Sequence, residues 1–206
     1  MPNSKKLFQL ANDHEIWENF KSGDKSSLSY IYLQYFPSMF QYGIRFKDDT
    51  EFIEDCIQDV FLKLIQAGER LSSTDNIRFY LFKALKNSIY KKIEKSKKIE
   101  MVEFVTLKFD APFSLEEELA EKENLSKKEM ALQKALKDLS DRQREIIYLR
   151  YECSMEYDQI CEIMQLKNDS ARKLVSRAIK SLREIIDDQL NLPTLFLMLF
   201  SKKHVL

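Results

Sequence analysis

Residues Leu139–Glu184 read LSDRQREIIYLRYECSMEYDQICEIMQLKNDSARKLVSRAIKSLRE. Apolar side chains recur here at spacings of three and four residues, which predicts three short amphipathic helices in close succession. The last helix, from about Ser170, has an apolar face and an opposite face that is mainly basic. The apolar face is formed by Ala171, Leu174, Val175, Ala178, Ile179 and Leu182, and the basic face by Arg172, Lys173, Ser176, Arg177 and Lys180.

This arrangement has two interpretations. A short helix, a tight turn and a second helix with a basic outer face are typical of a helix-turn-helix DNA reader. A small helical bundle with a solvated basic face would show the same pattern. At the turn, Gln165 stands where a glycine is expected, so a left-handed conformation there would cost on the order of 1 kcal/mol.

Length and composition indicate an all-helical protein. The chain has 206 residues, enough for two small domains that each bury a sufficient core. It contains three Gly and four Pro, fewer than the turns of a strand-rich fold would require. Net charge is zero, so global charge does not indicate a polyanionic partner.

Local charge is more informative. Residues 78–98 contain eight basic side chains against one acid, Glu94. Residues 100–123 contain eight acids against Lys108 and Lys122. These alternating blocks suggest separate surfaces for separate partners.

Other features suggest a cytoplasmic protein. Cys56, Cys153 and Cys161 lie within apolar helical patterns, and we expect small core residues of a reducing compartment, neither disulfides nor metal ligands. We expect no signal peptide. The apolar stretch Thr194–Phe200 is too short to span a bilayer.

The first half of the chain shows several helical runs. One follows the candidate caps Asn12 and Asp13, a second starts near Ser26 with a kink expected at Pro37, and a third spans residues 51–66 after caps at residues 48–50. The third run has an apolar stripe that includes Ile65. Its outward positions are Glu51, Glu54, Asp55, Gln58, Asp59 and Leu62. An apolar Leu62 within an acidic face suits a partner surface, although a solvated face is the commoner arrangement.

A polar loop over residues 66–76 precedes a long helix over residues 77–98. Aromatic rings and lysines alternate on the outer faces of this helix. Lysine gains from counterion release at phosphates, and aromatic rings stack on unpaired bases. Asn87 adds an amide that can read a base edge.

Residues 99–124 lose this periodicity and include an acidic tract, so we interpret them as a linker. About 25 residues could reach roughly 80 Å when fully extended.

With both halves in view, the chain resembles an extracytoplasmic-function (ECF) sigma factor of the sigma-70 family of RNA polymerase factors. EDCIQDVFLKL, from Glu54 to Leu64, is similar to the family's core-polymerase-binding helix. IRFYLFKALKN, from Ile77 to Asn87, is similar to its promoter-melting helix. Residues 139–151 and 157–164 resemble its second DNA-binding region, and NDSARK, from Asn168 to Lys173, resembles the variant common in Bacteroidota-type members. Tyr80, Cys161 and Gln165 replace the usual Trp, Ala and Gly.

The resemblance implies an all-α fold of two small helical domains joined by a flexible linker. Residues 1–98 would form a sigma region 2-like bundle, residues 99–124 the acidic linker, residues 125–190 a region 4-like helix-turn-helix domain, and residues 191–206 an apolar tail. The implied partners are core RNA polymerase, through its β′ and β subunits, and promoter DNA. An anti-sigma factor is a further candidate partner.

The resemblance also assigns residues. Core polymerase would bind Glu54, Asp55, Gln58, Asp59 and Leu62. The −10 element would bind Tyr80, Lys83, Lys86, Asn87, Tyr90 and Lys91. The −35 element would bind Ser170, Arg172, Lys173, Ser176, Arg177 and Lys180. We expect no catalytic residue, metal, cofactor or small-molecule substrate.

Two further hypotheses differ in class. A stand-alone helix-turn-helix regulator would bind duplex operators as a dimer and would need no polymerase-binding helix. A helical adaptor without DNA binding leaves the basic blocks unexplained. The apolar tail suits either a helix packed on the C-terminal domain or a contact for an anti-sigma partner or a membrane surface.

Overall fold

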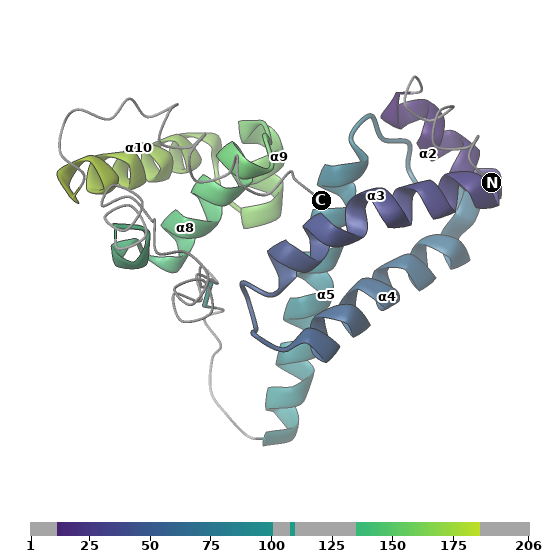
Figure 1. Ribbon diagram of the computed structural model, residues 1–206, viewed down its shortest axis with the longest axis horizontal. Helices are drawn as coiled ribbons and strands as arrows, with labels where there is room; N and C mark the ends of the chain where they lie inside the picture. Colours follow the sequence, from purple (N-terminus) through teal and green to yellow (C-terminus); the bar gives the residue numbers. More distant parts are fainter. Residues whose placement is uncertain (1–11, 101–107, 110–134, 186–206) are drawn as a thin grey trace, which may run out of the picture. The chain divides into compact units, whose positions relative to one another are not determined.

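The computed structural model describes residues 12–100, 108–109 and 135–185, and these residues form helices and no strand. The chain divides into two compact units, Met1–Leu107 and Lys108–Leu206. The prediction of an all-α protein with two small helical domains is confirmed. Figure 1 shows the helices of both units, which are described separately below.

The first unit is a bundle built mainly from three long helices. Its elements are α2 (Asp13–Lys21), α3 (Lys25–Gly43), α4 (Thr50–Ala67), the 3₁₀ turn η1 (Gly68–Arg70) and α5 (Ile77–Glu100). The long helices α3, α4 and α5 pack against one another, and α2 packs on α3 near η1 (Figure 1). The helix continues through Pro37, where the sequence suggested a kink.

Side-chain caps explain where these helices begin. The predicted caps are confirmed at Asn12, which accepts from the Glu15 amide at 2.8 Å, and at Asp49, which accepts from the Phe52 amide at 3.0 Å. Such a bond satisfies one of the free N–H groups of a first helical turn. Asp24 caps α3 in the same way.

The core of the first unit includes several large aromatic side chains. Trp17 is fully buried, and its indole N–H donates to the Ser72 carbonyl at 2.9 Å. The rings of Tyr42 and Phe82 stack with centroids 4.8 Å apart. Burying side chains of this size contributes roughly 1.5–3 kcal/mol each.

Asp13 ties three helices together. Its carboxylate accepts from the Tyr35 hydroxyl at 3.1 Å and from the Ile77 amide at 2.8 Å. Burial, together with the Asp13 charge, raises the pKa of the Tyr35 phenol. The start of α5 is therefore fixed to α2, which sets the register of the long helix.

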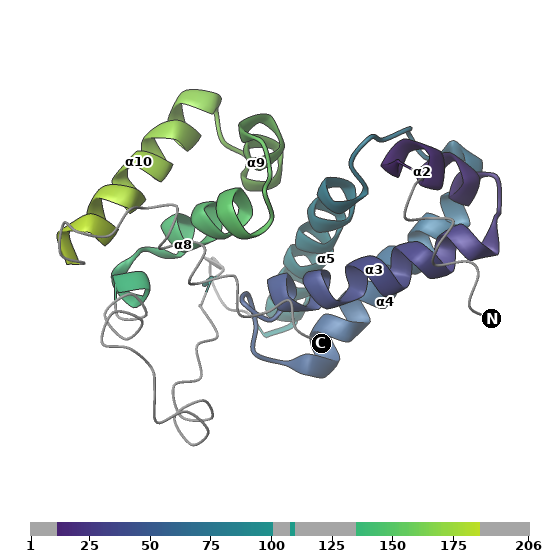
Figure 2. The ribbon, with the colours of Figure 1, turned by 45° about the horizontal axis from the view of Figure 1, so that its top comes forward.

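The second unit contains the stretch quoted first. Its described helices are α8 (Asp141–Ile147), the π-helical turn η2 (Tyr148–Glu152), α9 (Tyr157–Met164) and α10 (Asn168–Ile185). Ser140 caps α8 in a reciprocal box with Gln143, which confirms the predicted cap. Figure 2 shows α9 leading through a short turn into α10.

Gln165 occupies the turn between α9 and α10, where a glycine is usual. Gln165 is left-handed, with φ 51° and ψ 53°, so this turn has the conformation that costs a non-glycine residue about 1 kcal/mol. Arg142 donates from Nη2 to the Met164 carbonyl at 3.3 Å, so α8 helps to hold the turn.

Two described segments border or interrupt the predicted linker, residues 99–124. The helix α5 extends to Glu100, and Phe109 is buried in the second unit against the ring of Tyr148, with centroids 6.0 Å apart. Arg144 Nε donates to the Phe109 carbonyl at 2.7 Å. The rest of the predicted linker and the apolar tail at residues 191–206 lie outside the described residues.

The three cysteines are free thiols. Cys56 and Cys153 are buried, and Cys161 is half-buried. Burial raises the pKa of the Cys56 thiol to about 11, so this thiol stays protonated at neutral pH.

Candidate functional site

The outward face of α4 presents the side chains predicted to bind core polymerase. Asp55, Gln58 and Leu62 are exposed, and Glu54 and Asp59 are half-buried. The exposed fraction of Leu62 is 55%, which is high for a leucine in the middle of a helix. The structure therefore places these five residues on one accessible helix.

A lysine from the neighbouring helix organises the carboxylates of this face. Lys92 Nζ of α5 lies 3.0 Å from Asp59 Oδ2 and 4.0 Å from Asp55 Oδ2. Both carboxylates are solvent-accessible, so the pairs contribute at most about 1 kcal/mol each. Their main effect is to hold two acids side by side above α5.

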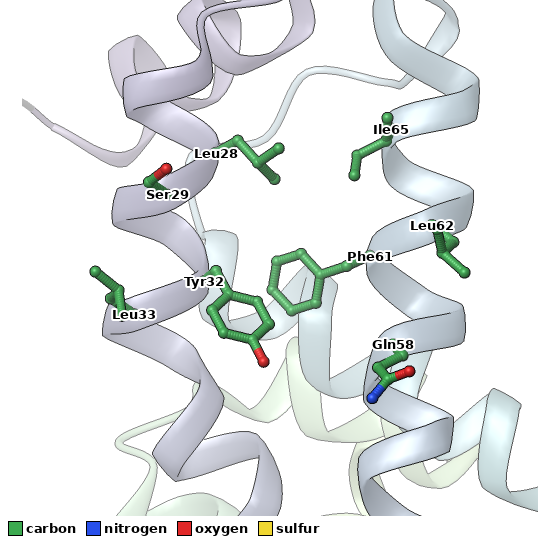
Figure 3. A pocket seen from close by; sticks show the side chains of 8 residues that line it. All are labelled: Leu28, Ser29, Tyr32, Leu33, Gln58, Phe61, Leu62 and Ile65. Atoms are coloured by element: carbon green, nitrogen blue, oxygen red, sulfur yellow. The ribbon is translucent and has the colours of Figure 1, made fainter.

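An apolar groove adjoins this face between α3 and α4. Figure 3 shows Tyr32 and Leu28 of α3 opposite Phe61 and Ile65 of α4. The groove has a volume of about 500 Å³. It is lined by Leu28, Ser29, Tyr32, Leu33, Gln58, Phe61, Leu62 and Ile65.

Sequence reasoning missed most of this groove. Ile65 belongs to the apolar stripe predicted for residues 51–66, yet its exposed fraction is 51%, and that of Leu33 on α3 is 66%. Periodicity indicates that a face is apolar, but it does not show whether another helix covers that face. Isolated surface leucines are common, whereas several around one groove mark an interaction surface.

Four of the six predicted −10 residues form one accessible line on α5. Lys83, Asn87 and Lys91 follow one another at intervals of four residues, and Tyr90 lies three residues after Asn87. Asn87, Tyr90 and Lys91 are exposed, and Lys83 is half-buried with its ammonium 5.6 Å from the Phe79 ring centroid. Basic and aromatic groups thus share one side of the helix.

The other two −10 candidates have inward contacts. Tyr80 is half-buried, and its ring lies 4.8 Å from that of Trp17. Lys86 is 7% exposed, and its ammonium lies 5.8 Å from both the Phe46 and the Tyr90 ring centroids. In this conformation neither side chain is as well placed for DNA as the other four.

The loop before α5 is fixed by polar contacts to α2. Besides the Trp17 bond to Ser72, Lys21 Nζ donates to Ser73 Oγ at 3.3 Å. His14 Nδ1 lies 3.1 Å from Asp75 Oδ1. The predicted polar loop over residues 66–76 therefore has a defined path beside the start of α5.

The helix-turn-helix has the two faces that the sequence predicted. Ala171, Val175, Ala178 and Leu182 of α10 are buried. The six predicted −35 residues, Ser170, Arg172, Lys173, Ser176, Arg177 and Lys180, are all exposed. A helix with an apolar inner face and a basic outer face is suited to the major groove.

Within the described part of the chain, two kinds of feature are absent. No group of His, Cys, Asp and Glu there could hold a metal ion. No helix there is long and apolar enough to cross a membrane.

Comparisons with known proteins agree with the two-unit architecture. The sigma-70 region 2 family model matches residues 31–99, and the sigma-70 region 4 model matches residues 129–182. A search of curated proteins finds no match.

Two solved structures have a similar fold. One is the sigma factor RpoE from Bartonella quintana in complex with the anti-sigma factor NepR, with 23% identity, a TM-score of 0.53, and coverage of 76% of this chain and 94% of that chain. The other is CnrH in complex with the cytosolic domain of CnrY, with 15% identity, a TM-score of 0.55, and coverage of 86% and 99%.

The two family models describe regions 2 and 4 of one family, and they occur here in that order. Together they cover more than half of the chain. The chain belongs to the sigma-70 family.

Proposed function

We propose that the chain is an ECF-type sigma factor that binds core RNA polymerase and directs promoter-specific transcription initiation. The observation that carries this proposal is the pair of sigma-70 regions, region 2 followed by region 4, with only residues 100–128 between the two matches. That interval is too short for a further large sigma region, and the two-region arrangement is the one that resembles the ECF group. The NDSARK segment of α10 supports, as a finer proposal, a Bacteroidota-type member.

The polymerase-binding role rests on the α4 face and its groove. Asp55 and Asp59 offer paired negative charge, and Leu62 connects this face to the apolar groove. Such a surface suits a helical partner with basic side chains beside an apolar ridge. We propose that core polymerase docks here through its β′ subunit.

The two DNA-binding roles belong to α5 and α10. The accessible line Lys83, Asn87, Tyr90 and Lys91 suits a melted −10 strand, because phosphates attract the lysines and an unpaired base can stack on the tyrosine. The exposed basic face of α10 suits the major groove of a −35 element. No catalytic role is proposed for the chain.

Regulation by an anti-sigma factor is part of this proposal. RpoE was solved with the anti-sigma factor NepR, and CnrH with the cytosolic domain of CnrY. We propose that a protein inhibitor also binds this chain, and that the chain itself acts in the cytoplasm.

Reconstitution with core polymerase tests the proposal. The wild-type chain should give promoter-specific transcripts that core polymerase alone does not give. The double variant Asp55→Arg/Leu62→Arg should lose core binding, because it reverses a charge and interrupts the apolar surface. Both side chains are exposed, so the variant should keep its helical circular dichroism and its unfolding midpoint.

Glu15→Arg is the matched control. It reverses an exposed carboxylate on α2, outside the proposed interface, and should bind core polymerase like the wild type. If the double variant still binds and initiates, the α4 face is not the docking surface. If the wild type directs no specific initiation, the proposed function is wrong.

The stand-alone regulator is a weaker alternative, because it leaves the region 2 match without a role. It predicts a dimer that binds duplex operators without polymerase. Gel filtration and DNA binding with and without core enzyme distinguish the two functions.

A further inference from the structure

Arg172 of α10 is held by a chain of contacts that begins on α9. Its guanidinium carbon lies 4.4 Å from the ring centroid of Tyr157, the first residue of α9. Its Nε donates to Asn168 Oδ1 at 2.7 Å. Asn168 Nδ2 in turn donates to Asp158 Oδ1 at 2.8 Å. Four residues from both helices of the helix-turn-helix therefore form one network.

The donor and acceptor groups of the four side chains allow only one order of hydrogen bonds in this network. Arginine can only donate and an ionised aspartate can only accept. A side chain that bridges them must present an acceptor to one and a donor to the other, and the asparagine amide does this. An alanine at position 168 would break the bridge, and an aspartate there would place a second carboxylate against Asp158.

The network leaves the end of the guanidinium available. Nε is used by Asn168 and the ring face of Tyr157 covers the flat side, whereas the structure gives the two Nη groups no partner among the residues that it describes. Arg172 is nonetheless exposed and lies near the start of α10, the part of a recognition helix that meets base edges. Two parallel N–H groups match the O6 and N7 acceptors of guanine in the major groove.

Arg150 also contacts the Tyr157 ring, and its hydrogen bonds go to residues other than those of the Arg172 network. Its guanidinium carbon lies 5.1 Å from the Tyr157 centroid, and its Nη1 donates to the Met155 carbonyl at 2.7 Å and meets Glu156 Oε2 at 3.2 Å. The position of the Tyr157 ring is therefore stabilised by residues that precede α9, independently of α10. The long Arg172 side chain is already ordered in the free protein, so it loses less conformational entropy on binding DNA. This favours a specific hydrogen bond to a base over a loose contact with phosphate.

We propose that Arg172 is a specificity-determining residue that reads a guanine in the upstream promoter element, and that Tyr157, Asn168 and Asp158 are positioning residues that hold it for this task. The proposal rests on the proposed function, because it requires α10 to enter the major groove of duplex DNA. It separates Arg172 from Lys173 and Lys180, whose ammonium groups would attract phosphates without reading sequence.

The test is a selection from duplexes randomised upstream of a fixed −10 element. The selection is carried out with the full-length chain assembled with core polymerase. The wild type is compared with five single variants: Arg172→Lys, Tyr157→Leu, Tyr157→Phe, Asn168→Ala and Lys173→Ala. For the wild type we expect one position with a marked guanine preference. Arg172→Lys keeps the charge but loses the planar fork of two N–H groups, so guanine preference at that position should fall, by up to about 150-fold, the upper limit for a good bidentate contact.

The positioning residues give a different signature. Tyr157→Leu and Asn168→Ala should weaken the same guanine preference, while Tyr157→Phe, which keeps the ring face, should retain it. Lys173→Ala should weaken binding to all selected sequences equally and reduce its salt dependence.

The outcomes separate this proposal from the function on which it rests. If the wild type selects no upstream sequence, the readout by Arg172 and the −35 role of α10 are overturned; if it also directs no specific initiation, the sigma-factor function is overturned as well. If the wild type selects a motif and Arg172→Lys selects the same motif with the same preference, the readout assignment is wrong while the sigma-factor function stands. The readout assignment is also wrong if Arg172→Lys changes the preference only at a position where the wild type selects a base other than guanine. Unchanged selection by Tyr157→Leu and Asn168→Ala would remove the positioning role.

Discussion

Gly43 shows how a single position limits the packing of the first unit. It is the last residue of α3, and a Cβ placed there would lie 2.6 Å from Ile53 Cγ2 of α4. Real Cβ atoms do not approach other atoms so closely, and Ile53 is fully buried, so the isoleucine cannot move away freely. The glycine is therefore required by helix–helix contact rather than by a turn.

Gly43→Ala is expected to destabilise the chain. Alanine gains up to about 1 kcal/mol in helix propensity, but overpacking a buried contact costs typically about 1–3 kcal/mol, so the clash should dominate. Urea unfolding of the full chain measures the difference. In an Ile53→Ala background the clashing group is absent, so the same change should be neutral or stabilising. Equal costs in both backgrounds would show that contact with Ile53 is not the cause.

At the scale of single elements, the start of α3 depends on one ionised side chain. Asp24 Oδ2 accepts from the amide and hydroxyl of Ser27 at 2.8 and 2.6 Å, and Oδ1 accepts from the Ser26 amide at 3.2 Å. The Ser27 hydroxyl bond, followed by the Ser27 amide bond, lowers the pKa of Asp24 below its ordinary value of 3.8. A lowered pKa means that the contribution is present above the ordinary value and is lost as pH falls through the value in the folded state.

Asp24→Ala should therefore destabilise the chain by about 1 kcal/mol at pH 7, the usual effect of losing a cap. The difference from wild type should shrink as the pH falls below about 3.8, where the wild-type carboxylate gains a proton. Urea midpoints measured from pH 7 to pH 2.5 test this. Asp24→Asn retains a cap at every pH and should stay closer to wild type at pH 7. A difference for Asp24→Ala that is constant with pH would contradict the assigned role of the charge.

The helices could be predicted from local sequence patterns, but which of their faces are covered by neighbouring helices could not. Caps at Asn12, Asp49 and Ser140 follow from short-range hydrogen bonding, so the sequence alone located those helix starts. The exposure of Ile65 and the burial of Lys86 depend on which neighbouring side chain reaches each position. That is a tertiary property, and a repeat of three and four residues carries no information about it.

The same distinction applies to the candidate sites. Residues that needed only to be outward on one helix, such as Asp55 and Arg177, were correctly placed at the surface from the sequence. The apolar groove needed two helices at once, and the network around Arg172 needed Tyr157 of α9 next to Asn168 of α10. No sequence pattern brings these partners together, because each pair meets only when the helices pack.

At the scale of the whole molecule, Phe109 decides where the second unit begins. The sequence assigns this residue to a linker and starts the second domain at residue 125. In the structure the side chain is 2% exposed and the carbonyl accepts from Arg144, which also donates to the carbonyls of Lys137 and Leu139. A residue far from α8 in sequence thus completes the core beneath it.

A fragment of residues 108–206 should consequently be more stable than one of residues 125–206. Removing a buried phenylalanine side chain typically costs about 3–5 kcal/mol, and Arg144 would also lose an acceptor. Urea unfolding of both fragments, followed by circular dichroism, measures the difference. Phe109→Ala in the longer fragment should reproduce most of the loss, and Phe109→Leu should retain more stability because it fills more of the space. If the two fragments unfold at the same midpoint, Phe109 contributes nothing to the second unit, and the region 4 domain begins where the sequence pattern placed it.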